Sequence, residues 1–64
     1  MADYTPAVKK AVRDAGAYRV RQGKGDHEIW YSPATERNFV IDGKIKSRHL
    51  ANAVLAQAGV SKRF

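Results

Sequence analysis

Residues 17–41 read AYRVRQGKGDHEIWYSPATERNFVI, a stretch in which two groups of turn-forming residues separate three short apolar runs. Tyrosine, valine, isoleucine, tryptophan and phenylalanine are prominent in the runs, and these residue types favour β-strands. Glycine, proline and aspartate are prominent between them, as expected of tight turns. The stretch therefore predicts an antiparallel meander with strands at about 18–22, 27–32 and 37–41.

The first predicted strand alternates apolar and basic side chains. Tyr18 and Val20 are separated by Arg19 and followed by Arg21. This period of two is typical of a strand that buries one face. We therefore expect the tyrosine and the valine to face the core, and both arginines to lie on the open face.

The second and third strands carry apolar residues on both faces, so periodicity alone leaves two registers open. In the favoured register, the odd-numbered apolar residues of both strands face the core, and Trp30 lies on the open face beside Arg19 and Arg21. Trp30 would then stack on bases or bind a partner protein. In the other register Trp30 is a core residue.

A helix is predicted on each side of the meander. Thr5 and Pro6 mark the start of the first, because threonine caps helix N-termini and proline fits the first helical turn. Gly16 ends that helix. The second helix is expected to begin after Ser47, another capping residue, and to end before Gly59. The residues that follow are expected to form a loosely held tail.

The element order α-β-β-β-α predicts an α+β fold of two layers. A three-stranded antiparallel sheet forms one layer, both helices cover one of its faces, and the other face stays open. At 64 residues, the chain is expected to form a single domain, residues 1–64. A domain of this size buries only about 60% of the surface that its unfolded chain exposes, so its core must be small.

The charge balance indicates a polyanionic partner. Twelve Lys and Arg against six Asp and Glu give a net charge of +6, which suits nucleic acid or an acidic protein. A membrane surface is disfavoured, because the basic residues are spread over every predicted element. The chain has no cysteine, and no apolar run approaches the roughly 20 residues that cross a bilayer. We expect a cytoplasmic protein.

The loop before the second strand holds the leading candidate site. Lys24 supplies positive charge, Gly25 lets a ligand approach the backbone closely, and His27 follows at the start of the strand. Histidine titrates near neutral pH, so it can take the proton of a ribose 2′-hydroxyl and cut RNA without a metal ion. The alternative interpretation is a solvated turn residue.

A second basic cluster surrounds the expected cap of the second helix. Lys44, Lys46 and Arg48 lie where the free amides and the dipole of a helix N-terminus attract phosphate. His49 could be a second acid or base there. The alternative interpretation, for the basic cluster and for His49, is that these are ordinary solvated side chains. The two histidines are far apart and carboxylates are not clustered, so neither a metal nor another cofactor is expected.

Several segments resemble the HicA toxins of bacterial and archaeal toxin-antitoxin pairs. The most specific is KGDHEIW, residues 24–30, where the family usually has Gly-Ser-His-His. Asp26 and Glu28 replace the usual serine and second histidine, and the His-Pro segment that often follows the third strand is missing. The similarity covers roughly residues 7–59, with matches at 14–16, 18–22, 24–30 and 55–59.

The resemblance implies a fold like a double-stranded RNA-binding domain, endoribonuclease activity toward messenger RNA, and an acidic HicB-type antitoxin that covers the active site. It assigns the catalytic role to His27. Our leading hypothesis is therefore a toxin that cleaves mRNA without a metal. In this hypothesis His27 is the general acid and base, and Lys24 and the other basic residues bind phosphate. The alternative is a non-catalytic RNA-binding module of the same fold.

Overall fold

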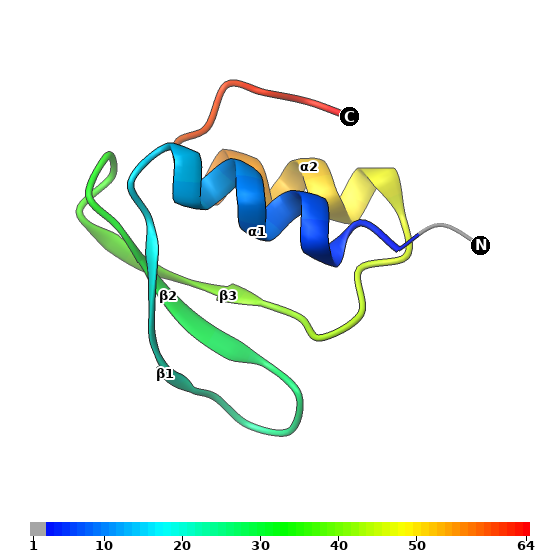
Figure 1. Ribbon diagram of the computed structural model, residues 1–64, viewed down its shortest axis with the longest axis horizontal. Helices are drawn as coiled ribbons and strands as arrows, with labels where there is room; N and C mark the ends of the chain where they lie inside the picture. Colours follow the sequence, from blue (N-terminus) through cyan, green and yellow to red (C-terminus); the bar gives the residue numbers. More distant parts are fainter. Residues whose placement is uncertain (1–2) are drawn as a thin grey trace.

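The computed structural model of the protein describes residues 3–64 (Figure 1). Their order confirms the α+β fold and the α-β-β-β-α layout predicted from the sequence. The five elements are α1 (Thr5–Asp14), β1 (Tyr18–Gln22), β2 (Glu28–Ser32), β3 (Arg37–Ile41) and α2 (Arg48–Gln57).

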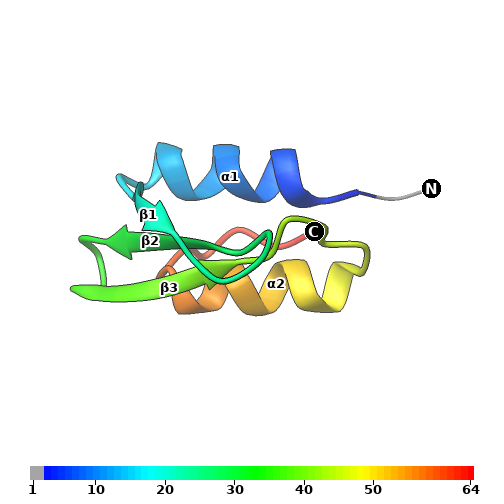
Figure 2. The ribbon, with the colours of Figure 1, turned by 90° about the horizontal axis from the view of Figure 1, so that it is seen from below.

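The three strands form one antiparallel sheet in the order β1-β2-β3. Both helices lie on the same side of this sheet in Figure 1. The turned view of Figure 2 shows α1 and α2 running in the same direction on either side of the midline of the sheet. The opposite sheet face has no helix over it, as predicted. Within residues 3–64, neither helix has the length and apolar character needed to cross a membrane.

Helix α1 begins at Thr5, but the threonine hydroxyl does not cap it as the sequence pattern predicts. The Asp3 carboxylate accepts the Thr5 N–H at 3.0 Å instead. The Thr5 hydroxyl accepts the N–H of Ile45 at 2.8 Å and donates to the carbonyl of Gly43 at 3.4 Å. Thr5 therefore ties the start of α1 to the segment between β3 and α2, because a buried hydroxyl needs tertiary partners there.

Helix α2 follows the prediction more closely. The Ser47 hydroxyl accepts the Leu50 N–H at 3.0 Å, which satisfies one of the free amides at the helix start. Gly59, with φ of +76°, follows the helix in the left-handed conformation that glycine adopts readily. The core face of α2 consists of Ala51, Val54 and Leu55. Leu50, in the first turn of α2, is 37% exposed.

The pairing of β2 with β3 shows that the favoured sequence register is wrong for Trp30. Ser32 faces Arg37 across a four-residue turn, and Trp30 faces Phe39. Even-numbered residues of β2 therefore share a face with odd-numbered residues of β3. Trp30 is 1% exposed and lies in the core with Phe39 and Ile41, whereas Val40 points outward as predicted.

Strand β1 also differs from its prediction, because all five of its residues are exposed. Tyr18 and Val20, expected in the core, are 54% and 48% exposed. The register shifts by one residue between Arg19 and Arg21, as at a β-bulge. Arg19 therefore lies opposite the buried Trp30, whereas Arg21 moves to the open face. The two arginines do not share a face.

The C-terminal residues pack against the domain and do not form the loose tail that the sequence suggests. The Phe64 ring lies 5.3 Å from the ring of Tyr4. The backbone N–H of Phe64 donates to the side-chain oxygen of Asn52 at 2.8 Å. Phe64 and Val60 both contact the hydrophobic core. These contacts cover part of the hydrophobic core. In a domain this small, that part of the core would otherwise be exposed to water.

Candidate active site

His27 lies on the open face of the sheet, directly before β2. The register pairs Tyr31 with Asn38 and Ile29 with Val40 on this face, so the next pair along both strands is His27 and Asp42. The imidazole Nε2 of His27 is 3.2 Å from Oδ1 of Asp42. Its side chain is 47% exposed. Sheet register therefore forms a histidine–carboxylate pair that solvent and substrate can reach.

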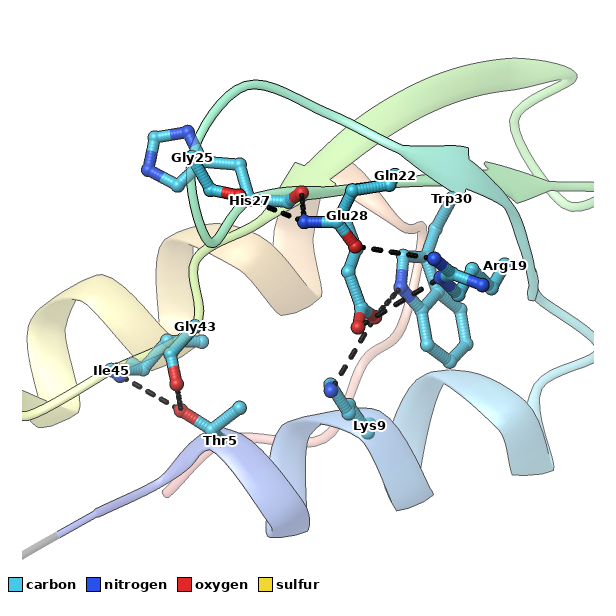
Figure 3. A network of polar contacts seen from close by, with 10 residues as sticks. All are labelled: Thr5, Lys9, Arg19, Gln22, Gly25, His27, Glu28, Trp30, Gly43 and Ile45. Carbon is cyan, nitrogen blue, oxygen red and sulfur yellow. Dashed lines mark hydrogen bonds and ion pairs between the residues drawn. The ribbon is translucent and has the colours of Figure 1, made fainter.

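The loop that presents His27 is fastened by Gln22, the last residue of β1. The Gln22 side-chain amide donates to the carbonyls of Gly25 and His27 at 2.9 and 3.0 Å, as Figure 3 shows. The Gly23 N–H also donates to the carbonyl of His27, at 2.8 Å. Gly25 has φ of +64°, a conformation that strains most other residues. Together with the His27 N–H, which donates to the carbonyl of Lys24 at 3.2 Å, these hydrogen bonds fix the backbone beneath the imidazole.

Asp26 brings a second carboxylate to the same imidazole. Its Oδ1 atom is 3.7 Å from Nε2 of His27. Asp26 also lies against Gly43, where a Cβ atom would approach the Asp26 side chain to 2.6–2.8 Å. The absence of a side chain at Gly43 lets the loop of His27 lie directly against the segment that supplies Asp42.

The arrangement distinguishes the two ring nitrogens of His27, because both nearby carboxylates lie beside Nε2. In the ring form that carries its proton on Nε2, beside these carboxylates, the lone pair is on Nδ1. Nδ1 is then the nitrogen that can accept a proton from a bound hydroxyl. A carboxylate that orients an imidazole in this way is a common feature of general-base catalysis.

Glu28 follows His27 in sequence but takes part in a separate network (Figure 3). Its Oε1 atom accepts the indole N–H of Trp30 at 3.0 Å and lies 3.4 Å from the Lys9 ammonium. Its Oε2 atom is 3.8 Å from the guanidinium of Arg19. The hydrogen bond from Trp30 lowers the pKa of Glu28, aided by Lys9 and Arg19 and opposed by partial burial. Glu28 has a structural role rather than one beside the imidazole.

Replacing Glu28 with Gln is expected to lower the stability at neutral pH by about 1 kcal/mol, because a charged acceptor forms stronger hydrogen bonds than an amide. The pKa of Glu28 is lowered in the folded state, so its charge stabilises the protein fully above the ordinary carboxylate pKa. That contribution is lost as the pH falls through the lower folded-state pKa. Melting temperatures of both proteins from neutral to acidic pH should therefore converge in acid. A difference independent of pH would contradict this role.

The structure divides the predicted basic residues into separate groups. Lys24 is exposed on the loop that carries His27, and Lys44 follows the Asp42-Gly43 segment that contacts this loop. Arg21 lies on the open face. On the helix side, the Arg19 guanidinium lies beside the Glu28 carboxylate and donates to the side-chain oxygen Oε1 of Gln22 at 3.2 Å.

Two further predicted phosphate contacts lie around the start of α2. Lys46 and Arg48 are exposed on either side of the Ser47 cap. The pKa of Asp3 is lowered, chiefly by hydrogen bonds with Thr5, with smaller contributions from the charges of Lys46 and Lys44. Hydrogen bonds between Thr5 and both Gly43 and Ile45 place the basic segment beside the N-terminus of α1, as well as beside the loop of His27.

The structure adds three residues that sequence reasoning missed. Asp42 pairs with His27, Gln22 fastens the loop, and Tyr31 contacts Tyr18 on the open face with ring centroids 5.7 Å apart. The sequence feature that could have identified Asp42 is the length of the turn between β2 and β3. That length sets the register, which places Asp42 opposite His27. Among residues 3–64, no group of three or more His, Cys, Asp or Glu side chains could hold a metal ion.

A groove between α1 and the C-terminal segment contains none of these candidate residues. The His27 side chain is about half exposed, so a ligand there would lie on accessible surface, which suits a polymer better than a small molecule. The groove is lined by Ala7, Lys10, Ala11, Asp14, Ala15, Val60, Ser61 and Lys62. Comparison of the chain with models of protein families, with curated proteins and with solved structures gives no match.

Proposed function

We propose that this protein is a metal-independent endoribonuclease that cleaves mRNA, and that it acts as the toxin of a toxin-antitoxin pair of the HicA type. The observation that carries the proposal is the exposed His27 imidazole, whose Nε2 lies 3.2 Å from the Asp42 carboxylate. It lies on a loop with Lys24 and Gly25, in a chain of net charge +6. These features bring a general base and a phosphate-attracting surface together.

In the proposed reaction, Nδ1 of His27 takes the proton of a ribose 2′-hydroxyl. The 2′-oxygen attacks the adjacent phosphorus, the bond from phosphorus to the 5′-oxygen breaks, and the imidazolium returns its proton to that oxygen. The products are a 2′,3′-cyclic phosphate and a free 5′-hydroxyl. Lys24 and the amides of its loop neutralise the charge that develops on the phosphate. Asp42 is a positioning residue, because it holds the ring without touching the substrate.

We further propose that the protein acts in the cytoplasm, where its mRNA substrate lies, and is neutralised by an acidic HicB-type antitoxin. An exposed catalytic histidine leaves the site active unless a partner covers it. An acidic partner is drawn to a chain of this charge, because complementary charge speeds association. Trp30 was the predicted partner contact, but its burial leaves the exposed residues around His27 to form that interface.

A non-catalytic RNA-binding module is the second candidate, and one observation favours it. Asp26 and Asp42 both lie within 4 Å of Nε2 of His27. Two carboxylates at that nitrogen repel a phosphate that approaches from the same side. Under this hypothesis the protein binds RNA in a salt-dependent manner and cuts nothing.

The test is cleavage of a defined single-stranded RNA and of the matching DNA by purified protein in the presence of EDTA. We expect the RNA to be cut and the DNA to remain intact, because the nucleophile is a 2′-hydroxyl that DNA lacks. The new ends should carry a cyclic phosphate. Cleavage of DNA, or cleavage that requires an added divalent ion, would refute the mechanism. Binding of RNA without cleavage would support the module instead.

A further inference from the structure

The open face of the sheet carries an exposed aromatic pair that the proposed reaction does not use. Tyr18 of β1 faces Tyr31 of β2, and their rings lie 5.7 Å apart at 47°. Tyr18 is 54% exposed and Tyr31 is partly exposed. A cross-strand pair of this kind adds little to a core from which it points away. Exposed aromatic rings on a sheet are a common platform for nucleic-acid bases.

The surroundings of this pair favour an anionic ligand. None of the described strand residues that the register places on this face is acidic, and Arg21 is the one with a formal charge. The face, as the register assigns it, comprises Tyr18, Arg21, Ile29, Tyr31, Asn38 and Val40. A polyanion with flat apolar groups, such as a nucleic-acid strand, matches aromatic rings beside a guanidinium.

The aromatic pair also lies in line with the candidate active site. Tyr31, Ile29 and His27 point to the same face at successive steps of two residues. Four residues of strand span roughly 13 Å. A single strand of RNA covers that distance in a few nucleotides, so one chain can reach the tyrosines and His27 together.

We propose that the open sheet face is a binding site for unpaired RNA, in which Tyr18 and Tyr31 stack on bases a few nucleotides from the phosphate at His27. The assignment deepens the proposed ribonuclease function and rests on it for the role of His27. Duplex RNA does not fit, because its bases are stacked on one another and unavailable to the tyrosines. The protein thus selects single-stranded segments of its substrate.

The test measures binding of a short fluorescent RNA with 2′-O-methyl riboses, which cannot be cut. We expect Tyr18→Ala to weaken binding about tenfold, the scale of one stacked base. Tyr18→Phe should bind like the native protein, because it keeps the ring. Tyr31→Leu should weaken binding as Tyr18→Ala does, because it keeps apolar area but has no π face. Circular dichroism melts verify that each variant is folded.

Two arginines supply a matched control for charge. Arg21→Gln should reduce the dependence of binding on salt by about one phosphate contact. Arg37→Gln should leave it nearly unchanged. Arg37 is also exposed on a strand, but it lies opposite the buried Ser32 and so on the helix side. Each substitution removes one positive charge. A difference in salt dependence between the two variants therefore reflects the position of the arginine and not the net charge of the protein.

The proposal is overturned if Tyr18→Ala and Tyr31→Leu bind the RNA as tightly as the native protein, or if a duplex competes as well as the single strand. Tyrosine variants that bind RNA normally but no longer bind an acidic protein would assign this face to the inhibitor instead. Because the probe cannot be cut, binding is measured independently of catalysis. A protein that cleaves nothing but loses binding in the tyrosine variants would refute the ribonuclease and keep the binding face.

Discussion

Replacement of His27 with Ala is expected to reduce the rate of RNA cleavage by about a hundredfold to ten-thousandfold, the usual contribution of a general acid or base. The effect should fall on kcat, since the imidazole moves a proton and contributes little to binding. Its side chain is 47% exposed, so the substitution leaves no cavity in the core. The melting temperature should stay close to that of the native protein.

Asp42→Asn is the companion variant. An amide still meets the imidazole at the same place but does not favour one orientation of the ring as a carboxylate does. We expect a smaller loss of kcat than for His27→Ala, with KM unchanged. The readout is the cleavage rate of an RNA with one fluorescent end, together with growth inhibition on expression in cells. Full activity of His27→Ala would assign the reaction to another group, or to a contaminant.

Replacement of Trp30 with Ala is expected to prevent the domain from folding. Trp30 is 1% exposed, its indole N–H donates to Glu28, and the Arg13 guanidinium lies 5.3 Å from its ring centre. Truncation of a buried aromatic residue costs about 3–5 kcal/mol. A domain this small has a total stability of about the same size. Far-ultraviolet circular dichroism and urea unfolding of the variant measure the loss.

Tyr31→Ala is the matched control for Trp30. It removes the neighbouring aromatic residue of the same strand, but on the open face, and is expected to leave the domain folded. A folded Trp30→Ala protein that has lost only its binding to a partner would show that tryptophan is exposed, as the favoured sequence register implied. That outcome would also invert the assignment of the open face.

The positions and types of the elements followed from local sequence. Ser47 caps α2 because its hydroxyl satisfies an amide within its own turn, and Gly59 ends that helix because it adopts a positive φ. Neither effect depends on distant parts of the chain. The buried residues Val8, Ala11 and Val12 of α1 are likewise three and four positions apart, as on one face of a helix. Such features depend on residues three or four apart, which a sequence displays directly.

Which side chains of the sheet face the core was decided by tertiary structure. Both strands around the second turn offer apolar residues to either face, so burial of Trp30 was settled by the length of that turn and by packing against the helices. The register shift after Arg19 then moved Arg21 to the opposite face, which no alternation in the sequence marks. Local composition placed a strand correctly at 18–22 but gave the wrong face for Tyr18 and Arg19, whereas Arg21 lies on the open face as predicted.

The candidate site shows the same division. The sequence by itself determined that the loop before β2 presents a histidine beside glycines and a lysine, because adjacent residues share a loop in any fold. Tertiary structure alone decided that Asp42 lies beside His27 and that Glu28 turns toward Trp30. Those contacts depend on which residues of β2 and β3 stand opposite one another and on which face of the sheet packs against the helices. The length of the turn sets the pairing, but only packing against the helices decides the face.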